Sequence, residues 1–235
     1  MSQVNTLENP DPRWKNLYMV AGIAAIVSII VILLGFITYF IWPYTPGQDS
    51  AENILVLLHD DPLGGLISLD LFLFIGNLFS LALFLTLYIS LRQVDEGIAL
   101  LALAVGLIGL VLLIPARPIL ELVHLSQAYM AAASETEQAQ IVGSAATLLA
   151  LFDGIGWYMN TLLGGLSLLT SSILMLRSRI YSKVTAYAGI ATNLVLCGFV
   201  IPPISLLMLF LCLPGYIIWY ILLARRFFQL GRVAR

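Results

Sequence analysis

Long apolar runs without charged residues are the feature that most restricts how this chain can fold. From Val184 to Ala224 there is no Asp, Glu, Lys or Arg, and Pro202-Pro203 divides this run into two. A helix needs about 20 mostly apolar residues to cross the hydrocarbon core of a bilayer. Only 10% of the residues are charged, whereas about a quarter are charged in an ordinary soluble domain. We therefore predict an all-α, polytopic membrane protein with six transmembrane helices in three hairpins; the other four runs are Leu17–Trp42, Gly64–Leu91, Ile98–Ala128 and Ile141–Leu176.

Basic residues gather on one side of the membrane that these six spans define. If both termini lie on the same side, ten of the eleven Lys and Arg lie there as well. Cytoplasmic loops carry the excess of Lys and Arg in membrane proteins, so we expect this side to be the cytoplasm. The expected organisation is a cytoplasmic segment at 1–16, a single transmembrane domain at 17–224 and a basic cytoplasmic tail at 225–235. The ten residues are Arg13, Lys15, Arg92, Arg177, Arg179, Lys183, Arg225, Arg226, Arg232 and Arg235.

The loop between the first two spans carries a helix signal. Asp49 followed by Glu52 is typical of a helix start. The next turns supply an apolar face, which predicts a short helix lying on the outer membrane surface. The apolar residues are Ile54, Leu55, Leu57 and Leu58.

Arg117 is the basic residue that this topology leaves on the outer side. Glu121 and His124 follow at offsets of four and seven, which predicts that the three side chains share one face of a helix. Pro115 and Pro118 interrupt the same apolar run and should kink it near its outer end. The simplest interpretation is that Arg117 and Glu121 neutralise each other beside headgroups and water.

Asp70 and Asp153 are expected at the same depth as Arg117. Counting ~1.5 Å per residue from the cytoplasmic end of each span puts the three roughly 29 to 35 Å above that end. This is the outer boundary of a hydrocarbon core about 30 Å thick. Asn77 and Asn160 each follow one of these Asp residues by seven positions, and so lie roughly 10 Å deeper on the same helix face. An amide at that depth needs a partner, so both should face the interior of the bundle.

Together these polar residues suggest a funnel, open to the outside, between the second, third and fourth spans. Its mouth would carry the charged residues and its floor the two amides. Trp157 could line the funnel, although an aromatic residue at a membrane interface is more often an anchor. The candidate ligand-binding residues are Asp70, Asn77, Arg117, Glu121, Asp153, Trp157 and Asn160.

Catalytic and metal-binding motifs are not found in the sequence. His59 and His124 are candidates for metal ligands at the outer face, but neither belongs to an HExxH or comparable spacing, so no metal or cofactor is predicted. The nucleophile motif GxSxG is missing, which favours a protein that is not an enzyme. The sequence contains no basic patch with interleaved aromatic residues, so it does not predict a nucleic-acid partner.

Several stretches carry the pattern of a known family. The second span reads GLISLDLFLFIGNLFSLALFLTLYISL and the third contains ALLALAVGLIGLVLLIP. Together with AENI at Ala51–Ile54, Asp70, and YAGI at Tyr187–Ile190, these runs resemble a bacterial family of six-span proteins catalogued as a domain of unknown function. The resemblance implies an integral protein of the bacterial cytoplasmic membrane, with an Asp in the second span that Asp70 matches. It implies no activity, substrate or cofactor, and no role for Arg117.

Two functions from different classes fit the sequence. The one that the sequence favours is the binding or transport of a small molecule or lipid at the funnel. The other is a structural or accessory membrane subunit, in which the same residues tie the spans together; an intramembrane enzyme is a third interpretation without a motif. Below Asn77 and Asn160 only hydroxyl groups and Asn193 interrupt the apolar spans, which argues against an ion channel. Membrane lipid is the expected partner, beside a small-molecule ligand or a membrane protein that the sequence does not identify.

Overall fold

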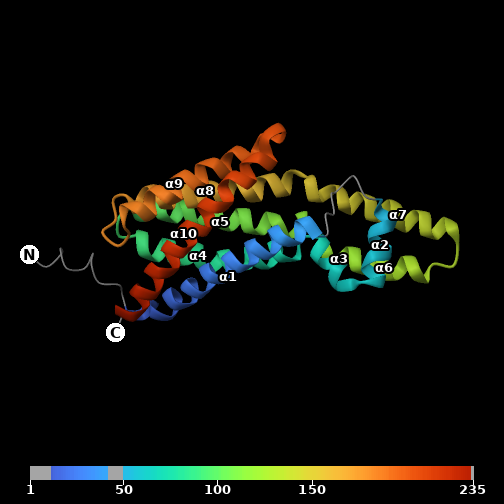
Figure 1. Cartoon of the computed structure of the whole chain (residues 1–235), viewed down its shortest axis with the longest axis horizontal. Helices are drawn as coiled ribbons and strands as arrows, with labels where there is room; N and C mark the ends of the chain where they lie inside the picture. Colours follow the sequence, from blue (N-terminus) through green and yellow to red (C-terminus); the bar gives the residue numbers. More distant parts are fainter. Residues whose placement is uncertain (1–11, 42–49, 234–235) are drawn as a thin grey trace, which may run out of the picture. The chain divides into compact units, whose positions relative to one another are not determined.

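The computed structural model describes residues 12–41 and 50–233, which form helices and turns without a strand (Figure 1). Within this part of the chain, six helical segments are long and apolar enough to cross a membrane. The predicted all-α polytopic fold is therefore confirmed. The six segments are Pro12–Thr38, Leu71–Leu91, Glu96–Ala131, Glu135–Met175, Lys183–Val200 and Ser205–Val233.

The α-helices are α1 (Lys15–Ile41), α2 (Ala51–Asp60), α3 (Pro62–Ser68), α4 (Leu71–Leu91), α5 (Glu96–Ala116), α6 (Ile119–Ala131), α7 (Glu135–Leu149), α8 (Ile155–Met175), α9 (Lys183–Cys197) and α10 (Ser205–Val233). Short 3-10 turns lie beside them at η1 (Pro12–Trp14), η2 (Ala150–Asp153), η3 (Gly198–Val200) and η4 (Pro202–Ile204).

The second, third and fourth apolar runs each contain a break. Leu69 and Asp70 separate α3 from α4, and Asp70 has a φ of 63°, in the left-handed region. The helix α5 ends at Ala116, two residues before Pro118, because a proline supplies no N–H and disfavours helical backbone in the residue before it. In the fourth run, η2 and Gly154 separate α7 from α8. The predicted kink is thus a complete break at Pro118, whereas Pro115 lies inside α5.

The described residues form two compact units whose boundaries fall inside α1, α4, α5 and α8. The α2 unit comprises residues 31–41, 50–75 and 112–158, and the α9 unit comprises residues 12–30, 76–111 and 159–233.

The α2 unit has its core where α2 packs against α6 and α7. Leu55 of α2, Leu122 of α6 and Phe152 of η2 are at most 1% exposed. Ser126 on α6 donates a hydrogen bond to the carbonyl oxygen of Leu55, and Tyr129 donates one to Glu52. The apolar face of α2 is therefore packed against protein, and the position of α2 at the outer membrane surface stays a prediction.

The start of α2 also differs in detail from the prediction. Ser50 is the N-cap, and its side-chain oxygen accepts a hydrogen bond from the backbone N–H of Asn53. Glu52 lies in the first turn, where a negative charge favours the helix N-terminus. Asp49, the expected start, lies outside the described residues.

The α9 unit is held by close helix contacts and by hydrogen bonds between helices. Gly189 on α9 lets Trp219 of α10 approach so closely that a Cβ on Gly189 would lie 2.6 Å from the indole nitrogen. Tyr216 on α10 donates a hydrogen bond of 2.9 Å to the side-chain oxygen of Asn193, which is fully buried. Small residues and buried hydrogen bonds at contacts of this kind are typical of helices packed in membranes.

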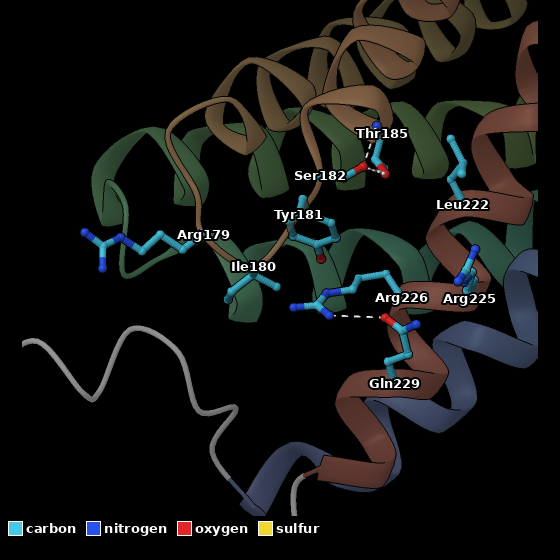
Figure 2. Close-up of a pocket in the computed structure, with 9 residues that line it drawn as sticks. All are labelled: Arg179, Ile180, Tyr181, Ser182, Thr185, Leu222, Arg225, Arg226 and Gln229. Carbon is cyan, nitrogen blue, oxygen red and sulfur yellow. Dashed lines mark hydrogen bonds between the residues drawn. The ribbon is translucent and has the colours of Figure 1, made fainter.

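A pocket of about 400 Å³ lies in the α9 unit, between the turn that precedes α9 and the later turns of α10 (Figure 2). Tyr181 on its wall is buried and shares a hydrogen bond of 2.7 Å with the hydroxyl of Ser90 on α4. Burial raises the pKa of the Tyr181 phenol, so this hydroxyl stays neutral over the physiological range.

Candidate functional site

Arg117 lies in the break between α5 and α6, and not on a helix face. It is 5% exposed, whereas Glu121 and His124 are exposed on α6. The prediction that these three side chains share one helix face was therefore wrong. The cause is Pro118, which ends the helix at the residue before Arg117 and turns the guanidinium away from the face that α6 presents.

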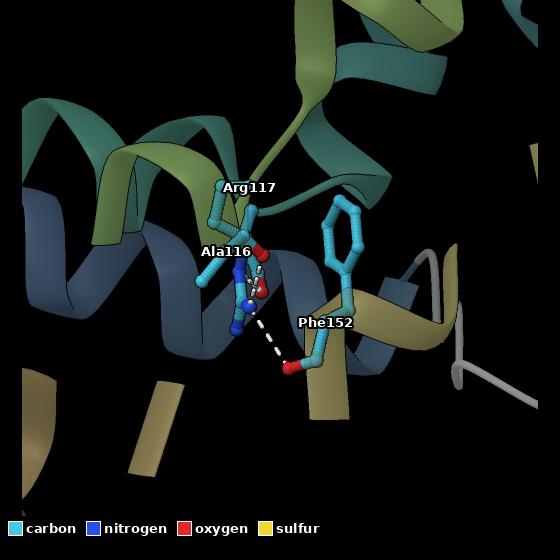
Figure 3. Close-up of polar contacts among 4 residues, drawn as sticks. Ala116, Arg117 and Phe152 are labelled. Atoms are coloured by element: carbon cyan, nitrogen blue, oxygen red, sulfur yellow. Dashed lines mark hydrogen bonds and ion pairs between the residues drawn. The ribbon is translucent and has the colours of Figure 1, made fainter. Parts of the chain in front are cut away.

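The guanidinium of Arg117 donates hydrogen bonds through Nε and Nη1 and lies against two aromatic rings. Its Nε donates to Oδ2 of Asp70 at 3.0 Å. Its Nη1 donates to the carbonyl oxygens of Ala116 at 3.0 Å and Phe152 at 2.9 Å (Figure 3). The rings of Phe152 and Trp157 lie over it, with centroids 4.7 and 4.5 Å from Cζ. We call Arg117, Asp70, Ala116, Phe152 and Trp157 the arginine clasp.

The clasp joins three helix breaks. Asp70 comes from the break between α3 and α4, Ala116 ends α5, and Phe152 lies in the turn between α7 and α8. The last carbonyl groups of a helix have no partner inside that helix, and in a membrane protein water does not readily supply one. Arginine is suited to this position because it offers several donors in a planar fork and never gives up its charge.

The acidic residues are less enclosed than the arginine. The side chain of Asp70 is 46% exposed although it pairs with Arg117, and Asp153 is exposed. The charge of Asp153 acts on both Asp70 and Arg117. Two acidic residues thus accompany one arginine at this site. Asp tolerates the left-handed backbone of position 70 better than most residues do.

The remaining predicted residues have other surroundings. The simplest interpretation gave Arg117 the partner Glu121, but its ion-pair partner in the structure is Asp70. Asn160 belongs to the α9 unit, where its amide donates to the carbonyl oxygen of Gly109 on α5 at 2.9 Å. Asn77, also in the α9 unit, is half-buried on α4, and His59 is exposed near the end of α2. Within residues 12–41 and 50–233, no three His, Cys, Asp or Glu side chains are placed to hold a metal ion.

Sequence reasoning did not find Phe152 or the carbonyl group of Ala116. Pro118 could have indicated that Ala116 ends a helix, and Gly154 that a turn precedes α8. Nothing in the sequence distinguishes Phe152 from the other aromatic residues of the apolar runs.

The comparison with protein families bears on the whole chain. A family model described as a domain of unknown function (DUF4386) matches residues 17–225. The chain belongs to this family. The resemblance to a six-span family catalogued as a domain of unknown function is therefore confirmed, and the match extends from α1 to α10. No curated protein and no solved structure matches the chain.

The chemistry available to this DUF4386 protein at the clasp is restricted by these contacts. Two aromatic rings lie against the guanidinium, and its Nε and Nη1 donate to protein oxygens. The accessible polar groups are the carboxylates of Asp70 and Asp153, which accept hydrogen bonds and attract positive charge. The site is therefore built around a buried cation and presents acceptors to its surroundings.

Proposed function

We propose that this DUF4386 protein is a structural or accessory membrane subunit in which the arginine clasp holds the broken ends of three membrane-spanning segments together. The observation that carries the proposal is that Arg117 is buried and donates hydrogen bonds to three different segments of the chain. These bonds come from Nε and Nη1, and the rings of Phe152 and Trp157 lie against the same guanidinium.

The energetics agree with a structural role. Removing Asp70 leaves the buried guanidinium of Arg117 without its ion-pair partner; for a fully buried pair this costs about 3–5 kcal/mol, and the 46% exposure of the Asp70 side chain reduces that figure. A buried carbonyl group that loses its hydrogen bond costs about 1–3 kcal/mol more. These costs are a large part of the ~5–15 kcal/mol that stabilises a typical native protein.

Substitution at the clasp tests the proposal. Arg117→Gln and Asp70→Asn should each lower the melting temperature of the protein in detergent and reduce its yield in the membrane. Glu121→Gln is the matched control, because Glu121 is exposed and stands four residues from Arg117. If both clasp variants melt at the wild-type temperature, the clasp does not hold the segments together and the proposal is wrong.

A second candidate function is the binding or transport of a small molecule or lipid at this site. The exposed carboxylates of Asp70 and Asp153 favour it, since they would accept hydrogen bonds from a cationic or donor-rich ligand. Breaks in membrane helices also mark binding sites in many transporters. Choline serves as a cationic probe: stabilisation of the wild type by choline, lost in Asp153→Asn at an unchanged melting temperature, would favour binding over the structural role.

The proposed setting is the cytoplasmic membrane of a bacterium, with residues 17–224 as one membrane domain. Residues 1–16 and 225–235 are then cytoplasmic. The distribution of ten of the eleven Lys and Arg supports this orientation. A fluorescent reporter fused after Arg235 should mature in the cytoplasm; activity of an export-dependent phosphatase at the same position would contradict the orientation.

A further inference from the structure

The pocket in the α9 unit is basic. Three of its lining residues are arginines, and no residue of the lining is acidic. Arg179 comes from the turn before α9, whereas Arg225 and Arg226 belong to α10 (Figure 2). The whole lining consists of Arg179, Ile180, Tyr181, Ser182, Thr185, Leu222, Arg225, Arg226 and Gln229.

Among these residues, Arg226 has a guanidinium that is only partly hydrogen-bonded by the part of the chain that the structure describes. Figure 2 shows its side chain reaching from α10 across the pocket, below Tyr181. Its Nη1 donates to Oε1 of Gln229 at 3.2 Å, whereas its Nε is buried and has no hydrogen-bond partner among the described residues. A buried donor without an acceptor is costly, more so when it is charged.

Groups on α9 add to the attraction for an anion. Ser182 is the N-cap of this 15-residue helix, and Thr185 lies in its first turn. The hydroxyl groups of these two residues are 2.9 Å apart and both residues line the pocket. The N-terminus of a helix carries partial positive charge and exposed N–H groups, which favour phosphate and other anions.

The place of the pocket in the fold further restricts the class of ligand that fits it. It lies just after the apolar segment that ends at Met175, at the start of the one that begins at Lys183, and near the end of the one that finishes at Val233. This is the level at which spans leave the hydrocarbon and reach lipid headgroups. Basic pockets between membrane helices at that level are suited to phosphate-bearing headgroups.

We propose that this pocket binds a phosphate group, supplied by an anionic phospholipid or by a soluble phosphate compound, with Arg226 and Arg225 as its principal donors. Arginine pairs with phosphate through two parallel N–H bonds, a geometry that a lone ammonium does not offer. The proposal depends on the α9 unit alone and is independent of the arginine clasp.

The experiment uses the full chain, purified in a neutral detergent. In the first arm, native mass spectrometry measures retention of phosphatidylglycerol against diacylglycerol of the same acyl chains, which lacks the phosphate, added in equal amounts. In the second arm, the melting temperature is measured with inorganic phosphate against chloride at matched ionic strength. Both arms compare the wild type with Arg226→Gln and Arg225→Gln. The matched control is Arg232→Gln, an exposed arginine of α10 that does not line the pocket.

The expected result is a preference of about tenfold for phosphatidylglycerol in the wild type, the size of one charge-assisted hydrogen bond. Both pocket variants should lose it and Arg232→Gln should keep it. If the preference is missing but inorganic phosphate stabilises the wild type and not the pocket variants, the phosphate comes from a soluble compound. If neither ligand is preferred, or if Arg232→Gln loses as much as Arg226→Gln, the pocket is not a phosphate site and the proposal is overturned.

Discussion

Replacing Arg117 with lysine separates the geometry of the clasp from its charge. Lysine keeps the positive charge but ends in a single ammonium group, which does not form the fork that reaches Asp70, Ala116 and Phe152 together. Arg117→Lys therefore keeps the ion pair at best. It gives up the two hydrogen bonds to carbonyl oxygens and most of the contact with the two rings.

The size of the effect follows from these losses. Each buried carbonyl group without its donor costs about 1–3 kcal/mol, and the weakened ring contacts add about 0.5–2 kcal/mol. The total is on the order of 4 kcal/mol. For a chain of this length, 1 kcal/mol corresponds to a shift of roughly 2–4 °C, so the melting temperature should fall by about 10 °C.

The assay is thermal denaturation of the purified protein in one detergent, followed by intrinsic tryptophan fluorescence and by aggregation. Arg232→Lys is the control, because Arg232 is exposed on α10 and the charge is again conserved. If Arg117→Lys melts within 2 °C of the wild type, charge alone is sufficient at position 117. The account of a fork that satisfies three helix breaks would then be wrong.

Two further variants test the packing of each unit. In the α2 unit, a Cβ on Gly156 would lie 2.9 Å from the Cβ of Ala116, so Gly156→Ala should lower the melting temperature. The control is Gly143→Ala, which has open space around it and should leave the melting temperature unchanged or raise it slightly. Equal effects of the two substitutions would contradict the close packing of α8 against α5. In the α9 unit, Tyr216→Phe removes the donor to the buried side-chain oxygen of Asn193. The free energy of unfolding, measured by chemical denaturation, should fall by about 1–3 kcal/mol. A variant as stable as the wild type would show that this hydrogen bond does not contribute to stability.

The apolar runs predicted the six spans because the lipid environment leaves few alternatives to a helix. The amphipathic segment Ala51–Asp60 was equally readable, since its periodicity fits a helix with one covered face. Both inferences depend on residues close together in the sequence. They needed no knowledge of which span lies beside which.

The clasp could be predicted only in part. Depth counting brought Asp70, Arg117 and Asp153 to a common level, and the structure pairs the first two. The partner of Arg117 was nevertheless misjudged, because a continuous helix was assumed through Pro118 and Glu121 was then the nearest carboxylate. Asp70 is 47 positions away, and Phe152 contributes a backbone oxygen, which every residue has. Contacts of that kind cannot be inferred from residue types or from short-range spacing.

The wide separation of the clasp residues along the chain bears on biosynthesis. Asp70, Arg117, Phe152 and Trp157 leave the ribosome at different times, and the last of them emerges only with the fourth apolar segment. Asp70 has no guanidinium partner until Arg117 has been synthesised. Arg117 in turn lacks the carbonyl oxygen of Phe152 and both aromatic rings until Phe152 and Trp157 follow. A nascent chain that stops before Trp157 therefore lacks part of the clasp, and its Arg117 guanidinium is incompletely covered.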